Sequence, residues 1–276
     1  MTKFSEKLIN EYKEVLGKKG YPKLKDIDFS WVQKWTEANE NDEFIPPTVP
    51  FVGYNYTEGG VLIYASAENL SNKGTHLECI RSSDNIYNRH RYAFRKFFDK
   101  EKRVWCQPIC DGKLTIAGAY ICKKRSIKNL SYKSPNDFLN NIAFGNFGKF
   151  SIDENGNGKN KDYASRLKFL EHSLDYVKKD ICTLRPNLII MPKTIYGLKT
   201  ISKWLKNLLD EIGLTETEII TIYQINTQTI NLFFNNKNIS INDEVVNIGE
   251  LENWLIEYGI KKDWYNPIFR YLNERI

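Results

Sequence analysis

The chain has 276 residues, of which 41% are hydrophobic and 13% aromatic, so it can bury a sizeable core and is not expected to be disordered. No apolar run is long enough for a transmembrane helix. The opening stretch MTKFSEKLINEYKEVLG lacks the apolar core of a signal peptide and predicts an amphipathic helix. These features favour a cytoplasmic protein with no membrane partner. The net charge of the chain is +6.

The first half of the chain predicts an amphipathic helix, a loop rich in proline and glycine, a buried strand and a basic helix, over residues 4–17, 40–60, 61–66 and 86–99. Residues 114–122, LTIAGAYIC, fit either a strand or a short buried helix. Residues 141–147, NIAFGNF, predict a second buried strand.

The second half continues this alternation with a helix, a strand, a helix and a strand, over residues 163–184, 188–191, 195–212 and 218–225. A hairpin over 230–247 and an aromatic helical tail follow. Short apolar strands that alternate with amphipathic helices predict a mostly parallel sheet covered on both faces.

We therefore expect a single α/β domain over residues 1–276, a three-layer α/β/α fold with a central, mostly parallel four-stranded sheet. Its core spans about 45–235. Residues 1–44 form an N-terminal helical extension and residues 236–276 a C-terminal extension.

The five cysteines are scattered along the chain, at Cys79, Cys106, Cys110, Cys122 and Cys182. An odd and scattered set is typical of reduced thiols. A metal or iron–sulfur site on Cys106, Cys110 and Cys122 stays open as an alternative, although the spacing is not C-x2-C. We expect no cofactor and no metal.

The positive charge is concentrated in residues 81–133, which hold fourteen Lys and Arg against four Asp and Glu. Aromatic residues interleave with the basic ones. This pattern favours a nucleic-acid-binding segment, and the alternative is a solvated helix face. The candidate contacts to a DNA backbone in it are Arg89, Arg91, Arg95 and Lys96.

Polar residues lie at the carboxyl end of each of the four predicted strands. They are Ser66, Glu68 and Asn69 at the end of the first, Asn146 at the end of the second, Lys193 and Thr194 at the end of the third, and Asn226 and Gln228 at the end of the fourth. The carboxyl ends of parallel strands meet at one edge, where α/β proteins bind ligands. The sequence therefore predicts a polar pocket at this edge, with caps and turns as the alternative.

No phosphate-binding glycine loop, G-x-S-x-G elbow or zinc-ligand spacing of the three histidines is present. A carboxylate, several amides and a lysine beside a basic aromatic segment suit cleavage of the bond between a sugar and a base. A carboxylate orients water and stabilises the developing positive charge on the sugar. Amides read an extruded base by its edge.

The order of four segments resembles that of the uracil-DNA glycosylase superfamily over roughly residues 45–235: VLIYASAENL, NIAFGNF, LDYVKKDICTLRPNLIIMPKTIYG and IYQINTQTI. The resemblance implies a base-excising enzyme that acts on DNA, with double-stranded DNA as partner. It implies that Glu68 or Asn69 positions water, that Asn146 reads the base, and that Asn226 and Gln228 occupy the leaving-group loop. Tyr54 and Ser66 would line the base pocket, and Lys193 and Thr194 would hold a phosphate.

The leaving-group loop departs from the family pattern, because Asn226-Thr227-Gln228 replaces His-Pro-Ser. This departure favours a substrate other than uracil. The resemblance to members of the superfamily that act in antiviral defence implies a hypermodified base of phage DNA. Two alternatives stay open, a DNA-binding module without catalysis and an α/β enzyme that processes nucleotides or sugar phosphates. DNA binding that falls steeply with salt would favour the glycosylase or the DNA-binding module over the enzyme that processes nucleotides or sugar phosphates.

Overall fold

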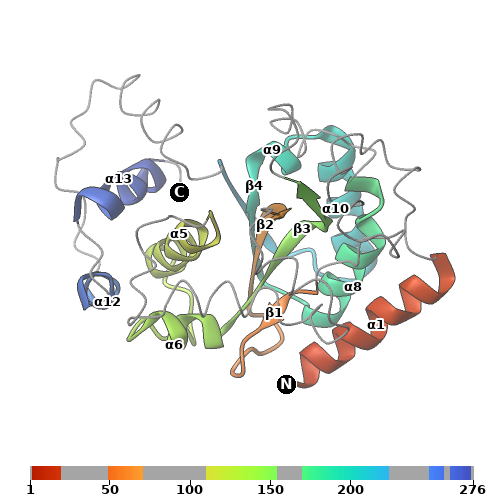
Figure 1. Cartoon of the computed structure of the whole chain (residues 1–276), viewed down its shortest axis with the longest axis horizontal. Helices are drawn as coiled ribbons and strands as arrows, with labels where there is room; N and C mark the ends of the chain where they lie inside the picture. Colours follow the sequence, from red (N-terminus) through yellow and green to blue (C-terminus); the bar gives the residue numbers. More distant parts are fainter. Residues whose placement is uncertain are drawn as a thin grey trace.

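The computed structural model describes residues 2–19, 49–70, 110–153, 170–223, 249–257 and 262–274. These residues form an α/β fold around a mixed sheet of five strands (Figure 1). The elements are, in chain order, α1 (Lys3–Lys19), β1 (Phe51–Val52), β2 (Val61–Leu70), α5 (Cys110–Lys124), α6 (Pro135–Asn140), β3 (Ile142–Asp153), α8 (Leu174–Leu184), β4 (Leu188–Pro192), α9 (Lys193–Tyr196), α10 (Lys199–Glu211), β5 (Glu218–Ile222), α12 (Glu250–Glu257) and α13 (Lys262–Asn273).

The strands lie in the order β1-β3-β2-β4-β5. Neighbouring strands from β3 to β5 pair in parallel, and β1 pairs antiparallel with β3. The prediction of a shared carboxyl edge requires β2 and β4 to be parallel, and the structure confirms that they are. The prediction of a loop throughout 40–60 was wrong at β1, because a strand of two residues is too short to show periodicity.

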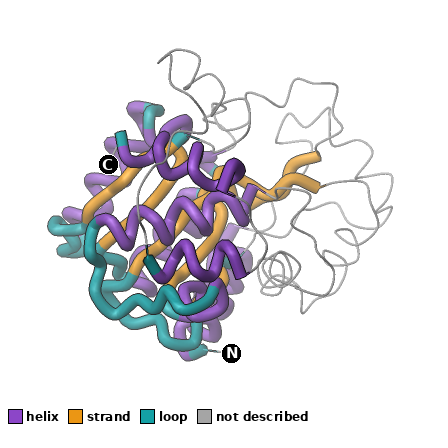
Figure 2. Tube along the Cα trace, turned by 90° about the vertical axis from the view of Figure 1, so that its left-hand side faces the viewer, coloured by secondary structure: helices purple, strands orange, loops and turns teal. Residues whose placement is uncertain are grey.

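Alternate residues of each strand point to two separate hydrophobic clusters. Val61 and Ile63 of β2 pack with side chains of α5, α12 and α13, whereas Leu62 and Tyr64 pack with side chains of α1, α8 and α10. Figure 1 shows α5 on one side of the strands and α8 and α10 on the other. In Figure 2 the side that carries α5 faces the viewer, and helices lie in front of the strands. The connection from β2 to β3 thus places its helices on one face of the sheet, and the connections from β3 to β4 and from β4 to β5 place theirs on the other. Right-handed crossovers require this arrangement when the chain reverses its direction across a sheet.

Two strands are longer than predicted. The strand expected at 61–66 continues to Leu70, and the one expected at 141–147 continues to Asp153. The extra residues pair with one another, and the register shifts between Ala67 and Asn69. Backbone pairing therefore extends the two strands past their apolar segments, which is a feature that hydrophobicity alone does not reveal.

Most predicted helices are confirmed, with corrections at their ends. Residues 114–122 belong to helix α5, which settles the alternative left open there. The helix predicted over 163–184 is interrupted by a turn at 172–173, and the one over 195–212 is divided by a break at Gly197 and Leu198. The basic helix over 86–99 and the hairpin over 230–247 lie outside the described residues. No described helix has the length and apolar character needed to cross a membrane.

Replacing Gly53 with alanine is expected to destabilise the β1 edge of the sheet. A Cβ atom on Gly53 would lie 2.3 Å from the backbone of Asn140, and the Gly53 N–H donates to the Ile142 carbonyl at 2.9 Å. Because backbone atoms must shift to relieve this overlap, we expect a loss of about 1–3 kcal/mol in the free energy of unfolding. Thermal or urea unfolding measures this loss. An unchanged midpoint would contradict the close packing of Gly53 against the backbone of Asn140.

Candidate active site

The sheet opens between β2 and β4 at its carboxyl edge. These strands pair over three positions, from Val61 opposite Leu188 to Ile63 opposite Ile190. Beyond Ile63, β2 stays paired with β3, while β4 stays paired with β5 as far as Pro192. The chain reverses its direction across the sheet at this point, because β3 lies on one side of β2 and β4 on the other. Open α/β sheets bind ligands at such switch points.

The strand registers place three predicted polar residues and one unpredicted tyrosine at this opening. Asn146 of β3 lies opposite Ala65, two residues beyond the last β2–β4 pair. Pro192 lies at the same level on β4, so Lys193 is one residue farther. Tyr223 follows Ile222, the partner of Pro192 on β5. We call Asn146, Lys193, Thr194 and Tyr223 the carboxyl-edge site.

Asn146 is a buried carboxamide within a strand rather than a residue of a loop. Only 2% of its surface is exposed, and its partner Ala65 belongs to the cluster on the α5 side of the sheet. The expectation that Asn146 lies at the end of its strand was therefore wrong, because β3 continues to Asp153. A buried carboxamide offers an acceptor and two donors in a fixed orientation, which suits recognition of a planar polar group.

Lys193 and Tyr223 come together at the carboxyl ends of β4 and β5. The Lys193 ammonium lies 5.0 Å from the centre of the Tyr223 ring, and Tyr223 is 37% exposed. Lys193 and Thr194 are both exposed. The pair places a positive charge and an aromatic ring next to each other in solvent, a combination that favours a phosphate and a base.

Ser66, Glu68 and Asn69 all lie within β2, so the prediction that Glu68 and Asn69 follow the strand in a loop was wrong. Ser66 is partly buried, one residue past the level of Asn146. Glu68 and Asn69 belong to the part of β2 that extends beyond β4 along β3. The backbone therefore brings them to the carboxyl side of the opening.

Tyr54 lies at the opposite edge of the sheet from these residues. The neighbouring Gly53 and Asn55 donate backbone hydrogen bonds to Ile142 and Asn140, at the amino end of β3. Tyr54 is 62% exposed there. The structure thus separates Tyr54 from the carboxyl-edge site, because β1 runs antiparallel to its neighbour. The remaining candidates lie outside the described residues: Arg89, Arg91, Arg95, Lys96, Asn226 and Gln228.

The described end of the basic segment lies near the amino edge of the sheet. Arg125, which follows α5, forms an ion pair of 3.3 Å with Glu218 at the first position of β5. Lys123 lies 3.9 Å from Glu250. This end of the 81–133 segment is therefore partly neutralised and does not lie beside the carboxyl-edge site.

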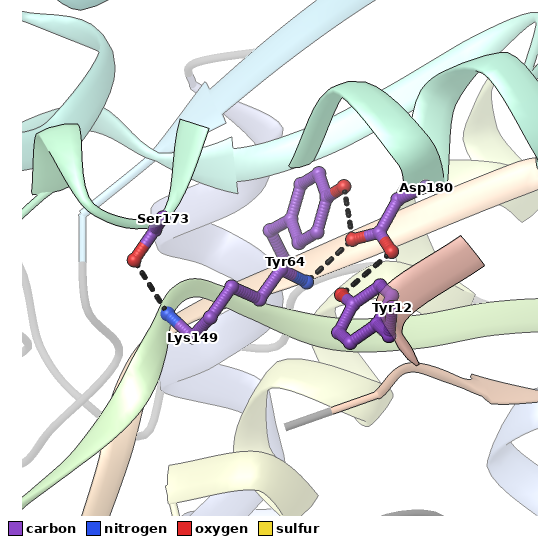
Figure 3. A network of polar contacts seen from close by, with 5 residues as sticks. All are labelled: Tyr12, Tyr64, Lys149, Ser173 and Asp180. Carbon is purple, nitrogen blue, oxygen red and sulfur yellow. Dashed lines mark hydrogen bonds and ion pairs between the residues drawn. The ribbon is translucent and has the colours of Figure 1, made fainter. Parts of the chain in front are cut away.

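A fully buried polar network joins α1, β2, β3 and α8 (Figure 3). The Asp180 carboxylate forms an ion pair with the Lys149 ammonium, and it accepts hydrogen bonds from the hydroxyls of Tyr12 and Tyr64 at 2.8 and 2.9 Å. The backbone N–H of Lys149 donates to the Ser173 hydroxyl at 2.9 Å. The network therefore ties the N-terminal helix to the strand segments next to Asn146.

Burial dominates the electrostatics of this network. It lowers the pKa of the Lys149 ammonium and raises the pKa of the Asp180 carboxyl, while the attraction between the two groups opposes both shifts. Burial and the Asp180 charge raise the pKa values of Tyr12 and Tyr64, so both phenols stay protonated donors. The Lys149 ammonium also lies 5.1 Å from the centre of the Tyr64 ring. With both side chains of the pair inaccessible to solvent, we assign the network a positioning role.

A sequence signal for this network existed. On α8, Tyr176, Val177, Ile181 and Leu184 form a buried stripe, and Asp180 lies on the same stripe. A carboxylate at an apolar position of a helix requires a buried cation or donor. Lys149 was the matching signal, because it follows Phe147 at the period of two that marks one face of a strand.

A surface groove of about 300 Å³ lies between α1 and α8. Three lysines and three acidic residues line it, and Lys179 forms ion pairs with Glu11 and Glu14 while Lys178 pairs with Glu211. The groove is therefore internally neutralised, and the carboxyl-edge site is the better candidate.

Among the described residues, no group of three His, Cys, Asp or Glu side chains is arranged to hold a metal ion. Cys110 and Cys122 lie twelve residues apart on α5, about 18 Å along the helix, too far to share one ion. Cys106 lies outside the described residues.

Scans against protein-family models, curated proteins and solved structures found no match to this chain.

Proposed function

We propose that this protein is a DNA glycosylase that extrudes a modified base from DNA and hydrolyses its bond to the sugar. The observation that carries the proposal is the opening of the sheet between β2 and β4, with Asn146, Lys193 and Tyr223 at its carboxyl edge. This arrangement provides the amide, the cation and the ring that base recognition needs. The chemical class comes from the resemblance of the four segments to uracil-DNA glycosylases.

Each residue has a defined task in this proposal. The buried Asn146 carboxamide reads the polar edge of the extruded base, and the Tyr223 ring stacks on a base. Lys193 and Thr194 hold the adjacent phosphate. Tyr223 replaces Tyr54 as the stacking residue, because Tyr54 lies at the amino edge.

Glu68 supplies the negative charge. As the bond breaks, positive charge builds on the sugar, and a carboxylate stabilises this transition state more than the ground state. Asn69 is the competing group for orienting water. Both belong to the part of β2 that extends beyond β4, and Asn226 and Gln228 complete the leaving-group loop.

The same proposal includes the finer features of the fold and the biology. The domain is a three-layer α/β/α fold whose mostly parallel sheet carries helical extensions at both ends. It acts in the cytoplasm on double-stranded DNA, with hypermodified phage DNA as the substrate in antiviral defence. The departure of Asn226-Thr227-Gln228 from His-Pro-Ser supports a base other than uracil.

Asn146→Ala is expected to lower the rate of base release at least tenfold, which corresponds to about 1.4 kcal/mol of barrier. The alanine removes the donors and the acceptor that read the base, while the rest of the DNA contacts remain. Mass spectrometry of released bases measures the rate, and thermal unfolding checks the fold. Asn187→Ala is the matched control, because Asn187 is an exposed amide just before β4, at the amino edge. Equal rates for the wild type and Asn146→Ala would contradict the proposed reading of the base.

A second candidate is an α/β enzyme that acts on a nucleotide or sugar phosphate. The position of Lys123 and Arg125, at the described end of the 81–133 segment, favours it, because both pair with acidic residues instead of flanking the carboxyl-edge site. Binding of a short DNA duplex distinguishes the two. A small-molecule enzyme would show weak binding and no loss of affinity on substitution of Lys193.

A further inference from the structure

The outer face of α10 carries a row of lysines that begins at the carboxyl-edge site. Lys199, Lys203 and Lys206 are exposed, and their spacing of four and three residues places them on one face of the helix. The opposite face buries Ile201, Leu205, Leu208 and Leu209. We call Lys199, Lys203 and Lys206 the α10 lysine row.

The row is not neutralised by its surroundings. Among the described residues, none of its lysines forms an ion pair, whereas Glu211 at the end of the same helix is paired with Lys178 at 2.9 Å. A solvated helix face commonly places opposite charges three or four residues apart. The acidic residues of α10, Asp210 and Glu211, both lie in its last turn. Lys199 and Lys203 therefore have no acidic residue three or four positions away in the helix, whereas Lys206 has Asp210 four positions farther on.

Helix stability does not explain the row either. Lys199 is the first residue of α10, and the first turn holds no acidic residue. The amino end of a helix carries partial positive charge, so a lysine there is unfavourable and an acidic residue is preferred. The N-cap Leu198 also provides no side-chain hydrogen bond to the first turn. This end of the helix is therefore strongly positive, as an anionic partner would require.

We propose that the α10 lysine row binds the phosphate backbone of duplex DNA beside the carboxyl-edge site. Lys199 and Lys203 lie about 6 Å apart along the helix axis, and the whole row spans about 10 Å. Lysines act as flexible point charges for phosphates and carry no sequence information, so the row fixes the position of the duplex without selecting the base. The inference rests on the proposed function in taking DNA as the partner.

The test is the salt dependence of binding to an unmodified duplex. Each neutralised phosphate contributes about −0.9 to the slope of log K against log salt. We expect Lys199→Gln with Lys203→Gln to reduce the magnitude of the slope by about 1.8, and addition of Lys206→Gln to reduce it by about 0.9 more. The matched control is Lys3→Gln with Lys7→Gln, an equal change of charge on the exposed face of α1, which should leave the slope unchanged.

The outcomes separate this inference from the proposed function. An unchanged slope in the α10 variants, or equal losses in the α10 and α1 variants, overturns the lysine row even where the wild type releases bases. A reduced slope in the α10 variants alone supports the row, even where no base is released and the glycosylase proposal fails. A wild type that binds no duplex at low salt overturns the row. Thermal unfolding of each variant checks that surface charge alone has changed.

Discussion

Replacing Asp180 with alanine is expected to lower the free energy of unfolding by about 3–5 kcal/mol. The substitution leaves the Lys149 ammonium buried without its counter-charge and removes the acceptor of the Tyr12 and Tyr64 hydroxyls. A lone charge in this environment cannot recover the hydration that it lost on folding. Urea unfolding monitored by tryptophan fluorescence measures the effect.

Glu211→Ala provides the matched control. It also removes a carboxylate from an ion pair with a lysine of α8, but this pair with Lys178 is exposed. Such surface pairs contribute about 0–1 kcal/mol. If Asp180→Ala and Glu211→Ala destabilise the protein equally, the network does not hold α1 against the sheet as the structure indicates.

Glu68→Gln is expected to lower the rate of base release at least tenfold, or about 1.4 kcal/mol of barrier. Glutamine keeps the size and most of the hydrogen-bonding capacity of the side chain but removes the charge that stabilises the developing sugar cation. DNA affinity and thermal stability should stay near those of the wild type. Single-turnover release of free base, measured on saturating enzyme, isolates the chemical step.

Asn69→Ala tests the competing assignment of the water-positioning residue in the same assay. A larger loss with Asn69→Ala than with Glu68→Gln would transfer that role to Asn69. Wild-type rates for both variants would contradict a catalytic role for this part of β2. A loss of activity that follows a loss of folded protein would assign the pair a structural role instead.

The sequence predicted the alternation of strands and helices well, because periodicity reports which face of an element is buried. The strand at 188–191 and the helix at 4–17 are present with nearly the predicted bounds. Prediction from the sequence failed where pairing between strands decides the structure. The extension of β2 to Leu70 and the short strand at Phe51 depend on partners in β3, far away in the sequence.

The candidate site was predictable in part for the same reason. The rule that parallel strands share a carboxyl edge led to Asn146 and Lys193, and their strands are indeed parallel and aligned in register. Tyr223 was missed because it falls inside the strand predicted over 218–225, whereas β5 ends at Ile222. Tyr54 was grouped with the wrong edge because the direction of a two-residue strand is not encoded in a local pattern.

The most direct test of the central claim is mass spectrometry of bases released by the wild-type protein from a panel of normal and phage-modified DNAs. The account predicts release of at least one modified base as the free base, with an abasic site left in an otherwise intact strand. Release of no base from any DNA in the panel, or of nucleotides through cleavage of the backbone, would contradict it.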